Sequence, residues 1–276
     1  MQQINCLNLC EILPYLQKKN HEILESAKQL AGFSVCERIY VGSSFCGKYF
    51  LEQSDATLKD LIEICENENI KITLAIPVFS EGDLESGKKK LAHITHMAKD
   101  TIDEFTVNDY GMLSYLNSIK DQFHQAINLG SLFMKDYRDP RYEEYFQIPW
   151  KPKVFTDYFK KVLEEYNIKT CEFDMTHRDM NFCEVPARVE IGVHVPFTYQ
   201  TVGRICEYAS IHKDITEKFR PNATCENNCS DNLVRYSVSD GNMEYIRFGR
   251  TVYFRHPGFE AKDLERYRLI YFPLDL

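Results

Sequence analysis

The stretch that decides the fold is residues 71–111, KITLAIPVFSEGDLESGKKKLAHITHMAKDTIDEFTVNDYG. It opens with an almost continuous apolar run, 71–79, which is typical of a buried strand, and continues into a helical pattern over 83–100. A second strand pattern, 103–111, closes the unit. A strand, a helix and another strand in this order predict a parallel βαβ unit, because parallel strands need a long crossover connection.

The same alternation extends over the first two-thirds of the chain. Strand patterns recur at intervals of roughly 25–40 residues, and about six or seven can be counted. This number favours a TIM-like α/β barrel, incomplete or distorted, over an open doubly wound sheet. No GxGxxG follows the first strand and no Walker A sequence occurs, which counts against a nucleotide site.

The predicted helices are 11–30, 55–68, 83–100, 111–119 and 155–168. The predicted strands are 37–45, 71–79, 103–111, 124–133, 169–175, 186–199 and 269–274, with a hairpin over 242–256.

Length and charge narrow the function classes. The chain has 276 residues, a net charge of −8 and a pI near 5.6, so no nucleic-acid-binding surface is expected from its charge. The N-terminal residues lack a basic region followed by an apolar run, and no apolar stretch approaches the length of a membrane span. We therefore expect a cytoplasmic protein.

The most informative chemistry lies in residues 206–229, CEYASIHKDITEKFRPNATCENNC. Cys206, Cys225 and Cys229 lie in a polar segment, where burial alone does not explain three thiols. Thiolates are soft ligands that suit iron–sulfur clusters or zinc, and three of them call for a fourth ligand from elsewhere. The other cysteines lie in mixed or apolar surroundings, where a small buried side chain is the simpler role; among these are Cys6, Cys10, Cys65, Cys171 and Cys183.

Four segments resemble a known family. EFTVNDYGMLSYL (104–116), INLGSLFMKDYRDPR (127–141) and RVEIGVHVPFTY (188–199) are similar, in this order, to segments of the collagenase-like peptidase family U-32. IYVGSSFCGK (39–48) and the late cysteines resemble the UbiU/UbiV iron–sulfur branch of that family. The resemblance covers about residues 38–235 and implies a single domain over 1–276, with the barrel in about 1–205 and a cluster-binding segment and hairpin in about 206–276.

This resemblance also implies a cofactor and a function. Cys46, Cys206, Cys225 and Cys229 are the implied ligands of a 4Fe–4S cluster. The implied function is oxygen-independent hydroxylation, with a small acidic oxygen donor such as prephenate and a second family member as heterodimer partner. Alternatives are zinc in the same ligands, a structural cluster in a non-catalytic subunit, or unrelated buried thiols. Cys36 is a rival fourth ligand, but it precedes a strand whereas Cys46 follows it.

Several other residues are candidates for binding or catalysis. Asn108 and Asp109 end a strand, where a barrel places its binding groups, although Asp109 would also cap the next helix. Glu190 alternates into the barrel and could act as an acid or base, or pair with an arginine such as Arg188 or Arg204. Arg138 and Arg141 could hold an acidic substrate, or pair with Asp139. His177 and His194 are lone histidines near strand ends, a pattern more typical of structural groups.

The family name suggests a peptidase as the second hypothesis. A hydrolase needs an activated nucleophile or a metal-bound water. Neither GxSxG nor HExxH occurs in the chain, and cysteines that hold a cluster cannot serve as nucleophiles. Peptidase activity is therefore the alternative to the iron–sulfur hypothesis, rather than the first expectation.

Overall fold

The computed structural model describes residues 2–14, 23–98, 100–134, 155–175, 182, 185–220, 223–237, 244–256, 258 and 264–275. At its centre is a closed barrel in the order β1-β12-β7-β6-β5-β4-β3-β2, with every neighbouring pair parallel. The structure confirms the predicted TIM-like barrel, and the barrel is closed rather than incomplete. Its strands are β1 (Gln2–Asn8), β2 (Arg38–Gly42), β3 (Lys71–Ile76), β4 (Ile102–Val107), β5 (Ala126–Leu129), β6 (Thr170–Asp174), β7 (Glu190–Val195) and β12 (Arg266–Tyr271).

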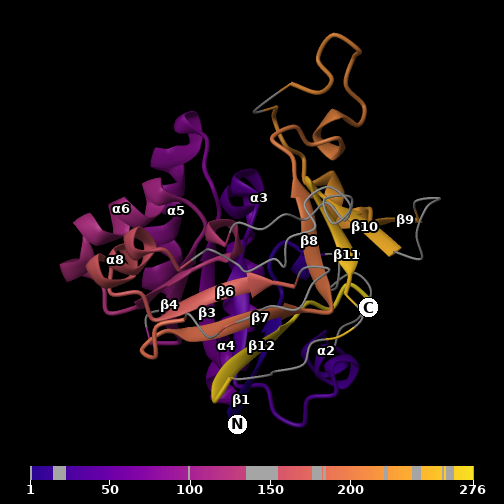
Figure 1. Ribbon diagram of the computed structural model, residues 1–276. Coiled ribbons are helices and arrows are strands. Elements are labelled where there is room, and N and C mark those ends of the chain that lie inside the picture. Colours follow the sequence, from indigo (N-terminus) through magenta and orange to yellow (C-terminus); the bar gives the residue numbers. More distant parts are fainter. Residues whose placement is uncertain are drawn as a thin grey trace, which may run out of the picture.

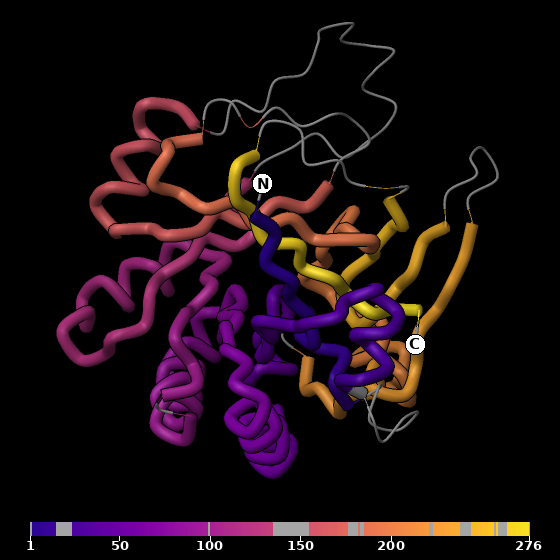
Figure 2. The backbone as a smooth tube through the Cα atoms, turned by 90° about the horizontal axis from the view of Figure 1, so that it is seen from below, coloured from indigo at the N-terminus to yellow at the C-terminus, as the bar shows by residue number. Residues whose placement is uncertain are grey.

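The two ends of the chain close this barrel together. Residues Gln2–Leu7 of β1 pair with Arg266–Tyr271 of β12, and Figure 2 shows the yellow end of the chain beside its indigo start. Strand β1 was not among the predicted strands, because QQINCLN lacks a clear apolar period. Strand β12 agrees with the predicted final strand, but it carries the barrel beyond the predicted boundary at residue 205.

Helices cover the outside of the barrel, and α5, α6 and α8 lie together on one side of it (Figure 1). Their apolar faces are buried against the strands, as in α8, where Phe159, Val162 and Leu163 are buried. The helices are α2 (Ile23–Ala31), α3 (Gly47–Glu52), α4 (Asp55–Asn67), α5 (Leu84–Met97), α6 (Tyr110–Ser118) and α8 (Asp157–Glu165), and the short 3₁₀ helices are η1 (Glu81–Asp83), η2 (Lys120–Gln122), η3 (Ser131–Phe133), η4 (Tyr208–Ser210) and η5 (Asn228–Asp231). Within the predicted helix over 11–30, residues 13–14 are helical and α2 begins at Ile23, and residues 15–22 lie outside the described residues.

A second sheet stands beside the barrel (Figure 1). It is antiparallel in the order β8-β11-β10-β9, with β8 (Phe197–Val202), β11 (Thr251–Arg255), β10 (Glu244–Phe248) and β9 (Val234–Ser237). The single long strand predicted over 186–199 is therefore wrong: the chain leaves the barrel at Pro196, which has no N–H to donate to a ladder. The predicted hairpin is present as β10 and β11, with its turn at Gly249 and Arg250.

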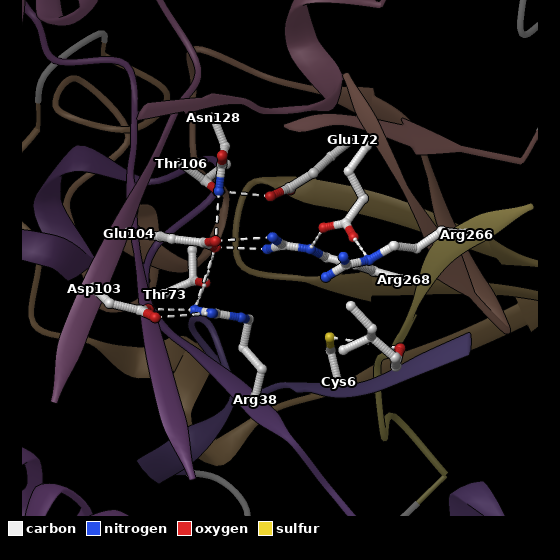
Figure 3. Close-up of polar contacts among 12 residues, drawn as sticks. Cys6, Arg38, Thr73, Asp103, Glu104, Thr106, Asn128, Glu172, Arg266 and Arg268 are labelled. Atoms are coloured by element: carbon white, nitrogen blue, oxygen red, sulfur yellow. Dashed lines mark hydrogen bonds and ion pairs between the residues drawn. The ribbon is translucent and has the colours of Figure 1, made fainter. Parts of the chain in front are cut away.

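The barrel interior holds an ion-pair network (Figure 3) beside a small apolar cluster that includes Cys6, Tyr40 and Ile270. Arg268 on β12 donates to both carboxylate oxygens of Glu104 on β4, at 2.5 and 2.8 Å, and also pairs with Glu190 on β7. Arg38 on β2 pairs with Glu104 at 3.2 Å and with Asp103 at 2.6 Å. Charges from four strands thus neutralise one another across the barrel axis.

Among the described residues, none of the helices is both long enough and apolar enough to cross a membrane.

Candidate functional site

A cavity of about 360 Å³ lies at the end of the barrel where the strands have their carboxyl termini. Its wall combines Glu11, Cys46 and Ser80, which follow β1, β2 and β3, with residues of the segment 204–229 and of the turn between β10 and β11. Cys46, Cys206, Cys225 and Cys229 all line it. The fold thus brings the distant Cys46 to the same cavity as the three late cysteines.

Burial separates these four cysteines from the others. Each of the four is partly exposed, whereas the remaining cysteines within the described ranges are buried: Cys6, Cys10, Cys36, Cys65 and Cys171. Cys36 donates to the backbone oxygen of Arg38 at 3.2 Å, at the start of β2, and so belongs to the opposite end of the barrel. Cys36 is therefore not placed to complete a site with the late cysteines.

Glu11 holds the loop that carries Cys46. This residue is 5% exposed and has a left-handed backbone with a φ of 64°, which is uncommon outside glycine. Its Oε1 accepts hydrogen bonds from the Ser43 hydroxyl at 2.5 Å and from the backbone N–H groups of Phe45 and Cys46 at 2.7 and 3.1 Å. The loop after β2 therefore depends on one carboxylate from the loop after β1.

Local hydrogen bonds shape the segment with the late cysteines. Ser210 donates to the backbone oxygen of Cys206 at 3.5 Å and accepts from the N–H of Phe219 at 2.8 Å. Asn228 donates to the backbone oxygen of Tyr208 at 3.2 Å, which ties η5 to η4. These contacts fold a polar stretch with few apolar side chains into a wall of the cavity.

Cys225 and Cys229 are set by two tight turns. Asn227 has a left-handed backbone with a φ of 53°, and its N–H donates to the Cys225 sulfur at 3.4 Å. Gly249 has a φ of 56° in the turn between β10 and β11, and a Cβ there would lie 3.8 Å from the Cys229 sulfur. The hairpin turn is thus packed directly against Cys229.

The thiols influence one another electrostatically. Burial, followed by the nearby Glu11, raises the pKa of Cys46 to about 12. Burial also raises the pKa of Cys229, with further contributions from Cys46, Cys225 and Cys206. Without a metal, Cys46 and Cys229 therefore hold their protons at neutral pH. A positively charged centre would displace those protons, because thiolates are the ligating form.

The cavity offers the four thiols that an iron–sulfur cluster needs. Structural zinc holds its sulfur ligands about 2.3 Å from one point. Within the described part of the chain, no three His, Cys, Asp or Glu side chains form a group compact enough for one ion. The four thiols instead surround a cavity of about 360 Å³. In a 4Fe–4S cluster the four cysteines bind at separate corners, so the cluster requires ligands that are spread apart.

Two buried donors in the cavity wall have no hydrogen-bond partner among the described residues. They are the Tyr49 hydroxyl and the Nε of Arg250. Such groups are rare in native proteins, and an ion or ligand is a common reason for them. Sulfur atoms in the cavity would act as acceptors for both. The residues present therefore fit a cluster in two ways, by their thiols and by their unpaired donors.

Asn108 and Asp109 have structural contacts and are not among the residues that line this cavity. Asp109 caps α6, with Oδ1 accepting from the N–H of Met112 at 2.9 Å. Its other oxygen is buried without a partner among the described residues, and burial raises the pKa of Asp109. Asn108 packs against Gly130, where a Cβ would lie 2.2 Å from Asn108 Oδ1. These contacts favour the capping and packing roles.

Glu190 and His194 belong to the barrel interior. Glu190 lies at the start of β7 and pairs with Arg266, at 2.6 Å, and with Arg268, not with the predicted Arg188 or Arg204. It is at the barrel end opposite to the cavity, where barrel residues serve stability. His194 Nε2 lies 3.1 Å from the Glu172 carboxylate and is buried. Its contacts agree with the structural role.

Other predicted candidates lie outside the described residues. They are the two arginines proposed to bind substrate, one histidine and one cysteine: Arg138, Arg141, His177 and Cys183. Sequence reasoning in turn missed several residues of the cavity wall, among them Glu11, Tyr49, Arg204, Arg220 and Arg250. Closeness in sequence to a predicted cysteine ligand was the signal for Tyr49, three residues after Cys46, and for Arg204, two residues before Cys206.

Comparisons with known proteins add little to this geometry. No family model matches the chain, and no curated protein matches it significantly. Among solved structures, the chain is similar to the spore cortex-lytic enzyme SleL of Bacillus megaterium QM B1551, with 13% identity and a TM-score of 0.43. The match covers 98% of this chain and 70% of the SleL chain. A likeness this distant carries no argument about function.

Proposed function

We propose that this protein binds a 4Fe–4S cluster through Cys46, Cys206, Cys225 and Cys229. The observation that carries the proposal is the meeting of these four partly exposed thiols at one cavity, while the other described cysteines are buried. The cavity lies at the barrel end that carries chemistry in TIM barrels. With all four cluster corners ligated by cysteine, the cluster would supply electron transfer.

The wider function that we propose is that of a subunit in oxygen-independent hydroxylation, as in the UbiU/UbiV branch of family U-32. Arg204, Arg220 and Arg250 line the cysteine cavity, together with Lys48 and three acidic residues: Glu11, Glu81 and Asp83. Guanidinium groups bind carboxylates well, so these side chains suit a small acidic oxygen donor such as prephenate. Arg204, Arg220 and Arg250 join Arg138 and Arg141, which lie outside the described residues, as the arginines proposed for this role.

The proposed partner is a second member of the same family. Three large apolar side chains of the late cysteine segment are exposed, namely Ile205, Ile215 and Phe219. Val234 and Tyr236 are also exposed, on β9 at the edge of the second sheet. Exposed apolar side chains and an open strand edge are features of protein-binding surfaces. They support a heterodimer formed next to the cluster segment.

The peptidase alternative has less support in this geometry. His194 lines a cavity of only about 10 Å³, together with Cys10, Glu11 and Asp174. This volume holds one water molecule at most and not a peptide. His194 Nε2 lies 3.1 Å from the Glu172 carboxylate, deep in the barrel. The iron–sulfur proposal therefore remains the first choice.

Anaerobic purification with iron, sulfide and zinc analysis tests the cluster. We expect a brown protein with about four iron and four sulfide per chain, as a 4Fe–4S cluster requires. Cys225→Ser should lose most of this iron, whereas Cys65→Ser, at a buried cysteine on α4, should keep it. Colourless wild-type protein with stoichiometric zinc, or equal iron in both variants, would contradict the proposal. Co-purification of a second family member from the native source checks the partner.

A further inference from the structure

Tyr49 and Arg250 line the cysteine cavity and come from two separate segments of the chain. Tyr49 lies on α3, directly after the Cys46 loop, and Arg250 lies in the turn between β10 and β11. The Tyr49 ring is 4% exposed, and its hydroxyl has no partner among the described residues. The buried Nε of Arg250 also has no hydrogen-bond partner among the described residues. A buried donor left unpaired costs about 1–3 kcal/mol, so an acceptor in the cavity would explain both groups.

Around the Tyr49 hydroxyl, Glu11 and Cys10 act more strongly than Cys229 and Cys46. Glu11 Oε1 already accepts three hydrogen bonds from the Cys46 loop, so sulfur atoms in the cavity are the candidate acceptors. The electrostatic neighbours of the Tyr49 hydroxyl include Cys229 and Cys46, and Arg250 is a neighbour of Cys46. Neither donor can lose its proton under ordinary conditions. A guanidinium stays charged throughout the usual pH range, and burial raises the pKa of Tyr49 well above its ordinary value. Both groups are therefore permanent donors in the wall of the cavity that the proposed cluster ligands also line.

We propose that Tyr49 and Arg250 donate hydrogen bonds to the sulfur atoms of the bound cluster and thereby raise its reduction potential. This inference rests on the proposed cluster. Reduction adds negative charge to the cluster and its thiolates, so a donor or a cation beside the sulfur atoms stabilises the reduced form more than the oxidised form. The two residues are positioning residues that set the potential of the centre without ligating it.

Tyr49→Phe is the sharpest test, since it removes one hydroxyl and keeps the ring. We expect full iron and sulfide content and a midpoint potential more negative than that of the wild type in an anaerobic redox titration. Tyr40→Phe is the matched control. Tyr40 is 1% exposed and its hydroxyl is also unpaired among the described residues, but it packs in the barrel with Cys6 and Cys10. Its potential should equal that of the wild type.

Arg250 provides a second, independent pair of variants. Arg250→Lys keeps the positive charge and loses the planar Nε donor, whereas Arg250→Gln loses the charge. We expect the potential to fall in both, and to fall further in Arg250→Gln. This pair also keeps the inference testable if Tyr49→Phe does not fold, which circular dichroism would show.

The outcomes separate this inference from the proposed function. Wild-type protein without iron and sulfide contradicts the cluster itself, and it is recognised before any potential is measured. Full clusters with wild-type potentials in both Tyr49→Phe and Arg250→Gln would overturn the inference and leave the cluster in place. A shift in only one of these variants assigns the role to that residue and overturns it for the other. A shift in Tyr40→Phe equal to that in Tyr49→Phe would also overturn it.

Discussion

The Glu11 side chain holds the loop that carries Cys46, a proposed cluster ligand 35 residues away in sequence. It accepts three hydrogen bonds from the loop that carries Cys46, and it does so from an uncommon left-handed backbone conformation. Such conformations cost of order 1–3 kcal/mol and persist where the surroundings impose them, often at functional sites. The Cys46 loop is therefore expected to keep its shape before any metal binds.

Replacing Glu11 tests this role. Glu11→Ala leaves the Ser43 hydroxyl and the backbone N–H of Phe45 without their acceptor, while the N–H of Cys46 keeps its second acceptor, Ser43 Oγ at 2.8 Å. We expect a loss of about 1–3 kcal/mol in the free energy of unfolding. Glu11→Gln keeps an oxygen at the same position and should lose less. Urea unfolding of the metal-free proteins measures the difference, and lower iron content in Glu11→Ala should accompany it. Equal losses in both variants would argue against the hydrogen bonds as the cause.

At the scale of single elements, the loops after the strands divide into two kinds. Those after β1 and β2 contribute to the cysteine cavity, whereas the junction of β4 with α6 is occupied by helix capping. Asp109 has a β-type backbone with a φ of −148° and accepts from Met112, as an N-cap residue does. The position of Asp109 at a strand end is thus explained without a catalytic role.

The capping role of Asp109 predicts how two substitutions change the free energy of unfolding. Asp109→Ala should lower the free energy of unfolding by about 1 kcal/mol, because α6 loses its N-cap acceptor. Asp109→Asn retains an acceptor of similar capping strength and should lie close to the wild type. Thermal unfolding and iron content would be measured together. A loss of iron in Asp109→Asn, with stability preserved, would instead point to a part in the site.

Over the whole molecule, the ion-pair network links strands that lie far apart in sequence. Arg268 on β12 joins Glu104 on β4 to Glu190 on β7, and Arg38 on β2 completes the contacts (Figure 3). Burial opposes ionisation of Glu104, but the hydrogen bonds and charges of Arg268 and Arg38 outweigh it and lower the pKa of Glu104 to about 2. Removing one member of a buried pair leaves an uncompensated charge, which is strongly destabilising.

This network predicts a specific response to acid. The pKa of Glu104 is lower in the folded chain than its ordinary value of 4.5, so its ionised form stabilises the fold above pH 4.5, and this stabilisation is lost as the pH falls toward about 2. The full contribution is about 3 kcal/mol. We expect Glu104→Gln to be less stable than the wild type at pH 6, with a difference that shrinks between pH 4.5 and 2. Urea unfolding over this range measures it, and a constant difference would contradict the assignment.

Local sequence patterns were sufficient for much of the fold and for part of the site. The apolar runs around residues 71–79 and 103–111 specify buried parallel strands, because period and burial are local properties of a strand. Phe248-Gly249-Arg250 specifies the hairpin turn, since Gly249 adopts a positive φ there. The spacing of Cys206, Cys225 and Cys229 likewise indicated one side of the site.

Only the tertiary structure decided the closure of the barrel and the composition of the cavity. Strand β1 has little pattern of its own and is defined by its partners β2 and β12, which lie on either side of it. The contacts of Glu11, Tyr49 and Arg250 likewise arise from segments that meet after the barrel closes. The physical reason is that the apolar period of a strand or helix depends on residues adjacent in sequence. The surroundings of a side chain instead depend on residues far away along the chain.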